Sequence, residues 1–154
     1  MAQALWVLNL VWQAVAAGFA FSYAVTLGAF FQWQVRAGDD EFFTRVYTPF
    51  RTALGLKWRY RLFMPFGPAL TAAASLALNH SAHAVLPQVL AVVVFFLYYF
   101  LAHVPTGFAQ AEEALVSGKG LTDRQRRIYL RCNIPLHILM GSLYAATAVA
   151  LVLT

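Results

Sequence analysis

Charged side chains occur in only two stretches of this sequence, and this restriction decides most of what the chain can fold into. All 11 lysines and arginines and all 6 aspartates and glutamates lie within residues 36–61 and 112–131. The stretches outside them are long, apolar and free of charge. About 20 apolar residues form a helix that crosses the roughly 30 Å hydrocarbon core of a bilayer. The chain is therefore predicted to cross a membrane several times.

The lengths of the uncharged stretches predict four membrane spans. Only residues 79–83 separate the second span from the third, so these two are expected to form a tight antiparallel hairpin. The predicted fold class is all-α: a polytopic membrane protein with a four-helix transmembrane bundle, in a single domain over residues 1–154. The spans are residues 5–34, 62–78, 84–102 and 133–153, connected through the charged segments 35–61 and 103–132.

The composition excludes several other classes of protein. Hydrophobic residues make up 61% and charged residues 11% of the chain, with a mean hydropathy of +0.64, whereas soluble domains have about 45–50% and about 25%. The single cysteine, Cys132, cannot form an internal disulfide, which excludes a disulfide-stabilised secreted domain. Despite the net charge of +5, a chain this apolar is not expected to bind nucleic acid.

Four spans place both charged segments on one side of the membrane, and both termini with the turn at 79–83 on the other. The positive-inside rule makes the charged side cytoplasmic. We therefore expect an integral protein of a bacterial cytoplasmic membrane with both termini outside. No basic residue lies within Met1 to Asn9, so we expect the first span to be retained rather than cleaved as a signal peptide.

The first charged segment combines apolar residues at helical spacing with basic ones, and it predicts an interfacial amphipathic helix between spans one and two, broken near Pro49. Its natural partner is the anionic headgroups of the lipid bilayer, and docking to a membrane protein partner is the alternative. The apolar positions are Phe42, Phe43, Val46, Tyr47, Phe50 and Leu54; the basic ones are Arg45, Arg51, Lys57, Arg59 and Arg61.

The second charged segment contains one turn and one helix start. Pro105 and Gly107 are expected to end the third helix. Thr122 with Gln125 three residues later is a capping-box pattern, which predicts a helix that continues into the fourth span. Glu112 and Glu113 are adjacent in sequence. On a helix they point about 100° apart, so at most one of them is expected to turn inward, toward the basic start of the fourth helix.

The fourth span carries the best candidate site. Asn133, His137 and Gly141 share one face at i+4 spacing, and Pro135 frees a backbone carbonyl in the same turn. An ionisable residue inside a span is a functional-site hypothesis by default. His103, at the same end of the third span, is the second candidate. The predicted catalytic residues are therefore His137, His103 and Asn133, with imidazole as general base and amide orienting a substrate.

Cofactor chemistry is not predicted, although alternatives exist. Two imidazoles facing one another across a bundle suit a haem or a transition metal, so haem remains the alternative to a site without a cofactor. His80 and His83 form an exposed H-x-x-H pair that is a weak copper or zinc site at most. No sequence motif of a metal site, a phosphate loop or a nucleophile elbow is present.

Tyrosines inside the spans suggest a ligand. Tyr98, Tyr99 and Tyr144 are deep in spans three and four, and their hydroxyls need partners. Together with Gly141 they are the predicted ligand-binding residues, lining a pocket for a flat, lipophilic molecule such as a quinone or polycyclic phenol. Packing of helices against one another is the simpler interpretation of the same residues.

A line of small residues marks the first span: Ala14, Gly18, Ser22 and Thr26 at i+4 spacing. Such a line lets a second helix approach closely. If it faces the fourth helix, the chain is a self-contained unit. If it faces lipid, it favours a protein partner or a homo-oligomer.

Three segments together resemble the anthrone oxygenase-like family, a group of small four-span membrane proteins. They are residues 17–22 (Ala-Gly-Phe-Ala-Phe-Ser), 104–106 (Val-Pro-Thr) and 127–133 (Arg-Ile-Tyr-Leu-Arg-Cys-Asn). The pattern of the family differs at Tyr129, where Trp is usual, and at His137, where Arg is expected.

The resemblance implies a reaction. Characterised members of the family convert an anthrone to an anthraquinone with oxygen, without an obvious metal or flavin. Here His137 or His103 is the base that takes a benzylic proton, and Asn133 with a tyrosine donates to the developing oxyanion. The competing hypothesis is a non-catalytic accessory or assembly subunit of a larger membrane complex. The residues alone leave open which of the two applies.

Overall fold

The computed structural model describes all 154 residues and is entirely helical. Four helical stretches are long and apolar enough to cross a membrane: Ala2–Ala37, Leu56–Asn79, Val85–His103 and Asp123–Val152. The chain is an integral membrane protein. Each predicted span lies on one of these stretches and overruns it by at most one residue. The all-α prediction is confirmed at this level.

The first long stretch consists of α1 (Ala2–Val25) and α2 (Leu27–Ala37). They meet at Thr26, whose hydroxyl donates to the carbonyl of Ser22. Gly38 ends α2 with a φ of 75°, a left-handed conformation that favours glycine.

A curved arm follows, built from α3 (Asp40–Phe42), the π-helical turn η1 (Phe43–Tyr47), α4 (Thr48–Ala53) and α5 (Leu56–Arg61). The segment predicted as an interfacial amphipathic helix is helical from Asp40 to Ala53, but the predicted break near Pro49 is wrong. That this segment lies at the membrane interface stays a prediction. Pro49 lies in the first turn of α4, directly after the wide turn of η1. A proline is tolerated there because its missing N–H is one that a helix start leaves unpaired. The bend of the arm comes instead at Gly55, between α4 and α5.

The second and third long stretches form the predicted hairpin. After α5, the turn η2 (Leu62–Phe66) contains a cis bond between Met64 and Pro65, and α6 (Gly67–Asn79) follows. The third stretch contains α7 (Val85–Tyr98) and the π-helical turn η3 (Tyr99–His103). A short helix, α8 (Phe108–Val116), then folds back toward the other helices.

The last helix, α9 (Asp123–Val152), begins with the predicted capping box. The Thr122 hydroxyl accepts from the backbone N–H of Gln125, and the Gln125 side chain accepts from the backbone N–H of Thr122. In the first turn of α9, Arg126 donates two hydrogen bonds to the carboxylate of Asp40, at 3.1 and 3.0 Å, and one to the carbonyl of Val35. These contacts tie the start of α9 to α2 and α3.

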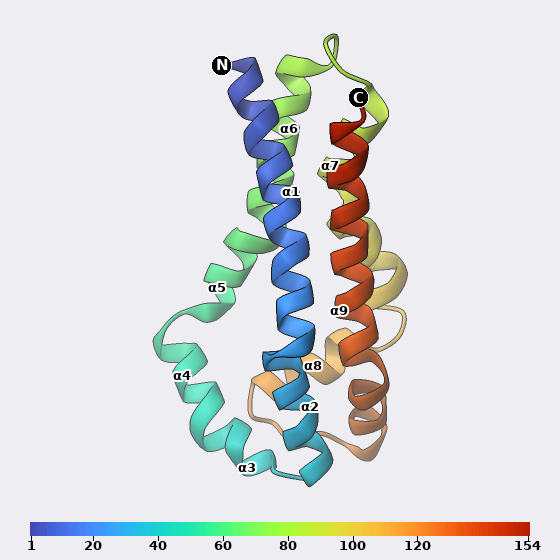
Figure 1. Cartoon of the computed structure of the whole chain (residues 1–154). Coiled ribbons are helices and arrows are strands. Elements are labelled where there is room, and N and C mark those ends of the chain that lie inside the picture. Colours follow the sequence, from blue (N-terminus) through green and yellow to red (C-terminus); the bar gives the residue numbers. More distant parts are fainter.

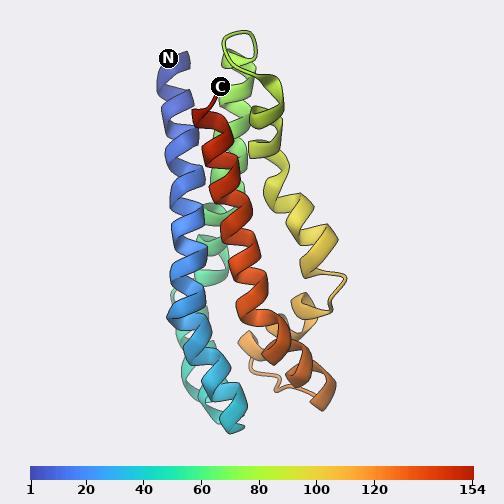
Figure 2. The same ribbon diagram turned by 45° about the vertical axis from the view of Figure 1, so that its right-hand side comes forward.

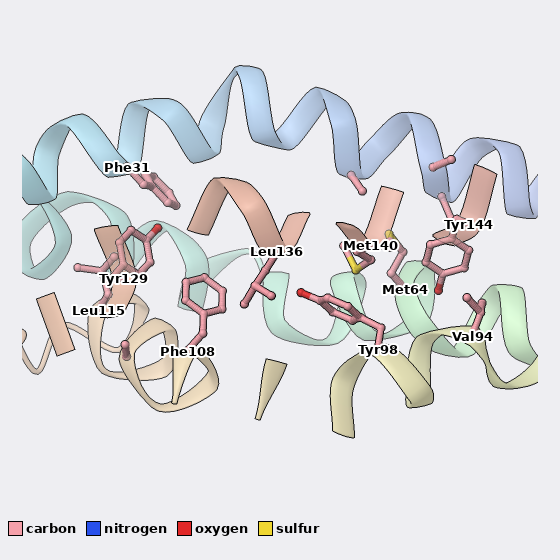
Figure 3. Packing of buried hydrophobic residues seen from close by; sticks show 14 of the residues in the cluster. Phe31, Met64, Val94, Tyr98, Phe108, Leu115, Tyr129, Leu136, Met140 and Tyr144 are labelled. Atoms are coloured by element: carbon pink, nitrogen blue, oxygen red, sulfur yellow. The ribbon is translucent and has the colours of Figure 1, made fainter. Parts of the chain in front are cut away.

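The four long stretches pack side by side: α1 contacts α9 and α6, and α7 contacts α6 and α9 (Figures 1 and 2). Both termini and the α6–α7 turn lie at one end, which we call the terminal end. The arm, α8 and the start of α9 lie at the other, the charged end (Figure 1). The main hydrophobic core runs along α9, with Tyr129 toward the charged end and Tyr144 toward the terminal end (Figure 3).

The terminal end is held together by buried amides. Gln88, fully buried, donates to the carbonyl oxygens of Asn79, His83 and Ala84 and so closes the hairpin. Asn79 donates to the carbonyl of Ala2, linking α6 to α1. Inside a membrane such bonds stabilise because lipid supplies no alternative partner.

The line of small residues in α1 faces outward. Ala14, Gly18 and Ser22 are exposed on the surface of the molecule, and a Cβ placed on Gly18 would meet nothing within 4 Å. The face of α1 buried against the other helices consists instead of Ala16, Ala17, Ala20 and Ala24.

Candidate functional site

A cavity of about 730 Å³ opens at the charged end. Its wall is formed by α1, the arm, η2, the end of α7 with η3, α8 and α9, and 15 of the 23 lining residues are hydrophobic. This volume is within the range of about 300–1,000 Å³ that suits small organic ligands. The predicted residues His137, His103, Tyr98 and Tyr99 all line it.

The turn between η3 and α8 positions one wall of this cavity. Val104 to Gly107 reverse the chain, and Gly107 adopts a φ of 77°, which favours glycine. A side chain here would also press on Ile128 of α9, since a Cβ would lie 3.3 Å from its Cδ1 atom. Because α8 folds back, its Glu112 comes next to His103, nine positions earlier in the chain.

Tyr98, His103 and Glu112 form a connected relay. The Tyr98 hydroxyl lies 3.0 Å from Nδ1 of His103, and Nε2 of His103 lies 3.5 Å from the Glu112 carboxylate. A carboxylate only accepts hydrogen bonds, so we assign the ring hydrogen to Nε2. Nδ1 of the neutral ring then accepts from the tyrosine. Figure 3 shows the Tyr98 hydroxyl directed toward Phe108 and Leu136, along the row of core side chains.

Glu112 is held in its ionised form. Burial against the cavity raises the pKa of the carboxyl, but the hydrogen bond with the His103 side chain and the electrostatic influence of His137, His103 and Arg51 together lower it by more, so the net pKa is below the ordinary value for Glu. The net pKa shift of Tyr47, at the arm side of the cavity, is upward instead: burial raises its pKa to about 12, and the nearby Tyr60 adds to the shift.

His137 has one nitrogen free for chemistry. Its Nδ1 lies 2.7 Å from the backbone carbonyl of Asn133, four residues earlier. A carbonyl oxygen only accepts, so Nδ1 carries the hydrogen and Nε2 keeps its lone pair. The ring packs against Tyr23 of α1 at 4.1 Å between centroids. Nε2 is therefore the candidate general base of the cavity.

The two histidines share one neighbour rather than forming a pair. Phe108 packs its ring edge-on against His103 at 5.0 Å and against His137 at 6.0 Å between centroids. Across the chain, no group of three or more His, Cys, Asp or Glu side chains lies close enough together to hold a metal ion. Haem between the two histidines stays the alternative to the predicted site without a cofactor.

Three predicted site residues are not brought to the cavity. The side-chain amide of Asn133 donates to the carbonyl of Gly28 at 2.8 Å, joining α9 to α2. Gly141 packs against Phe21, whose ring atoms would lie 3.0–3.1 Å from a Cβ at this position. Tyr144 is buried toward the terminal end, and its hydroxyl has no hydrogen-bond partner. Both Asn133 and Gly141 thus hold α9 against the first long stretch.

Sequence reasoning missed several residues of the cavity. Glu112 was expected, if turned inward, to face the start of the fourth helix, but it faces His103. The reversal at Pro105 and Gly107 was the available signal, because it returns α8 toward the third span. Tyr23 and the basic residues Arg51, Lys57 and Arg61 also line the cavity, and nothing in their spacing distinguishes them from membrane-facing residues.

The outer histidines have structural contacts. The His83 ring stacks on Trp6 at 3.8 Å between centroids and 7° between planes. His80 lies on the exposed turn, with Nδ1 3.3 Å from the carbonyl of Ala77.

No protein-family model, curated protein or solved structure matches this chain. The resemblance to the anthrone oxygenase-like family therefore stays a prediction that rests on the sequence segments alone. The geometry of the cavity is the observation on which a function can be argued.

Proposed function

We propose that this protein is a membrane oxidoreductase that binds a flat, lipophilic aromatic compound in the cavity and oxidises it with molecular oxygen, as in the anthrone oxygenase-like family that it resembles. The observation that carries the proposal is the meeting of four groups on one aromatic-lined cavity: the free Nε2 of His137 and the Tyr98–His103–Glu112 relay. Acid–base groups in an apolar pocket are the equipment that proton abstraction from a hydrophobic substrate needs.

The reaction follows from these positions. Nε2 of His137 accepts a proton from the benzylic CH₂ of an anthrone, and the electron pair spreads into the ring carbonyl. The carbanion reduces O₂ and forms a C–O bond, and the peroxide takes up a proton. Loss of water with the second benzylic hydrogen leaves a carbonyl, so anthrone and O₂ give anthraquinone and H₂O. The relay is placed to exchange a proton with ligand oxygen, since Tyr98 lies on the cavity and Glu112 is 32% exposed.

In this proposal the protein is a four-helix transmembrane bundle in a bacterial cytoplasmic membrane. The charged end, which carries all the lysines and arginines, is cytoplasmic by the positive-inside rule, and both termini are outside. The arm lies at the interface, where exposed Phe50 and Trp58 enter the headgroup region and basic residues contact anionic lipids. A lipophilic substrate then reaches the cavity from the membrane.

The test is turnover of a hydroxylated anthrone by the protein purified in mild detergent, followed by quinone absorbance and by oxygen uptake. His137→Gln keeps a polar side chain but removes the basic nitrogen, and a general base contributes about 10²–10⁴-fold. We expect a loss in that range. His80→Gln, on the exposed turn, is the matched control and keeps full activity. Turnover no faster than in empty micelles, or unchanged in His137→Gln, contradicts the proposal.

A second candidate function is a non-catalytic accessory or assembly subunit of a larger membrane complex. The outward line of Ala14, Gly18 and Ser22 favours it, because small residues facing lipid leave room for a partner helix. Gly18→Leu fills the line without a clash inside the molecule. If the line is an interface, this variant loses the partner or the second copy in a cross-linking experiment in membranes, whereas Val15→Leu, at a neighbouring outward position, retains it.

A further inference from the structure

Basic side chains gather at the mouth of the cavity. Arg51 of α4 and Lys57 and Arg61 of α5 all line it. Lys57 and Arg61 are one helical turn apart and so share a face of α5. Lys57 and Arg61 are exposed to solvent while they line the cavity, so we take their side of it as the mouth, and most of the other lining residues are hydrophobic.

The protein neutralises these three cations only in part. Lys57 and Arg51 share a single carboxylate, that of Glu113, which lies 3.1 Å from Nζ of Lys57 and 3.7 Å from a guanidinium nitrogen of Arg51. The other carboxylate of the cavity, Glu112, is engaged with His103. Arg61 has no carboxylate within 4.0 Å and only lies over the ring of Trp58, with 5.5 Å from its guanidinium carbon to the ring centroid. The mouth therefore carries excess positive charge in the absence of a ligand.

We propose that the ligand of this cavity is amphiphilic and anionic: an acidic group, such as a carboxylate, binds Arg61 and Lys57 at the mouth, and its aromatic body extends toward His137. This inference rests on the proposed function, since it names the substrate class of the same cavity. Guanidinium and ammonium groups bind carboxylate and phosphate through charge-assisted hydrogen bonds. The anionic headgroup of a lipid offers the same chemistry, so the experiment must separate the two sources.

The experiment compares two probes with one aromatic body, anthraquinone-2-carboxylate and 2-(hydroxymethyl)anthraquinone. Binding to the full-length protein in neutral detergent is measured by quenching of tryptophan fluorescence. We expect the carboxylate to bind about tenfold more tightly than the alcohol, the effect of one charge-assisted hydrogen bond. Added salt should reduce the difference, because the mouth is open to solvent.

Arg61→Gln is the decisive variant, and Arg59→Gln is its matched control. Both residues are exposed on α5 and both changes remove one charge, but only Arg61 lines this cavity. Arg61→Gln should abolish the preference for the carboxylate, Arg61→Lys should restore most of it, and Arg59→Gln should leave it intact. Loss of the preference in both Gln variants to the same degree reveals a general charge effect and overturns the inference.

A competition arm identifies the source of the acidic group. If phosphatidylglycerol, but not phosphatidylcholine, displaces the carboxylate probe from the wild-type protein, the anion site also accepts a lipid headgroup, and the inference of an anionic amphiphile is supported. Equal binding of both probes to the wild-type protein overturns the inference while the proposed pocket stands. Failure of both probes to bind overturns the proposed function and the inference with it.

Discussion

The two ends of the molecule use buried polar side chains in opposite ways. At the terminal end, Gln88 and Asn79 donate to backbone carbonyls of neighbouring segments. At the charged end, His103, His137 and Tyr98 line a cavity, and the Tyr98 hydroxyl bonds to His103. The same burial in a membrane protein therefore has two meanings: amides that bond to backbone hold helices together, and titratable groups that line a cavity are available for chemistry.

The sharpest test of this comparison makes the same change, alanine to phenylalanine, once at each end. Ala72 of α6 is fully buried at the terminal end, and Ala109 of α8 lines the cavity. Ala72→Phe forces a ring into packed helices and is expected to destabilise the protein by about 3 kcal/mol, the upper end of the usual range for overpacking. Ala109→Phe is expected to leave the free energy of unfolding nearly unchanged and to block probe binding.

Unfolding in mixed micelles and fluorescence quenching by an anthraquinone probe measure the two quantities separately. If Ala109→Phe lowered the free energy of unfolding as much as Ala72→Phe, the space beside α8 would have to be closed in the folded protein.

Removing one amide at the terminal end should weaken the fold without touching ligand binding. Gln88→Leu keeps the volume but deletes three donated hydrogen bonds. Hydrogen bonds between membrane helices contribute about 0.6–1.7 kcal/mol, so we expect a loss of about 1–2 kcal/mol. Gln3→Leu, exposed at the same end, is the control. A drop in probe affinity with Gln88→Leu would show that the two ends are coupled.

The pH dependence of the free energy of unfolding tests the charged end alone, through the carboxyl group of Glu112. Its folded pKa lies below the ordinary value of about 4.3, so the unfolded chain takes up the proton first as the pH falls. The stabilisation is therefore complete above about pH 4.3 and is lost as the pH falls through the folded pKa.

Glu112→Gln should abolish this part of the pH dependence, at a cost of about 1 kcal/mol or less at neutral pH, because the side chain is partly exposed. Stability measured between pH 3 and 7 tests it. A profile that is unchanged in Glu112→Gln contradicts the assignment.

The sequence was sufficient for the four long helices because charge and hydropathy act along the chain. It was also sufficient to single out His137 and His103, which line the cavity, because each stands alone in an apolar stretch. Their catalytic role stays a prediction. The sequence was not sufficient for Asn133, which has the same spacing as His137 yet bonds to Gly28, 105 positions away. The partner of a buried polar group depends on helix rotation and packing, which i+4 spacing on one helix does not contain.

Glu112 shows the same limit in the opposite case, a residue that lines the cavity although it was not predicted there. Its role depends on the reversal at Gly107, which directs α8 back along η3 rather than away from it. Proline and glycine predict that a turn occurs but not its direction. Likewise the segment between spans one and two is helical, as predicted, but it has no break at Pro49, because the wide turn of η1 lets the helix pass through this residue.

Tyr144, on the terminal side of the main core, gives the smallest and most discriminating effect. Its ring is buried in the main core, and its hydroxyl has no hydrogen-bond partner. Removing a buried polar group that lacks a partner is neutral or stabilising, so Tyr144→Phe should raise the free energy of unfolding by about 0–1 kcal/mol. It should also leave probe binding unchanged, since Tyr144 does not line the cavity. Tyr98→Phe, which removes the partner of His103, is the contrasting variant and should lower turnover. A destabilised Tyr144→Phe with weakened binding would mean that the cavity extends past Met140 toward the terminal end, and the boundary between the two ends would have to be moved accordingly.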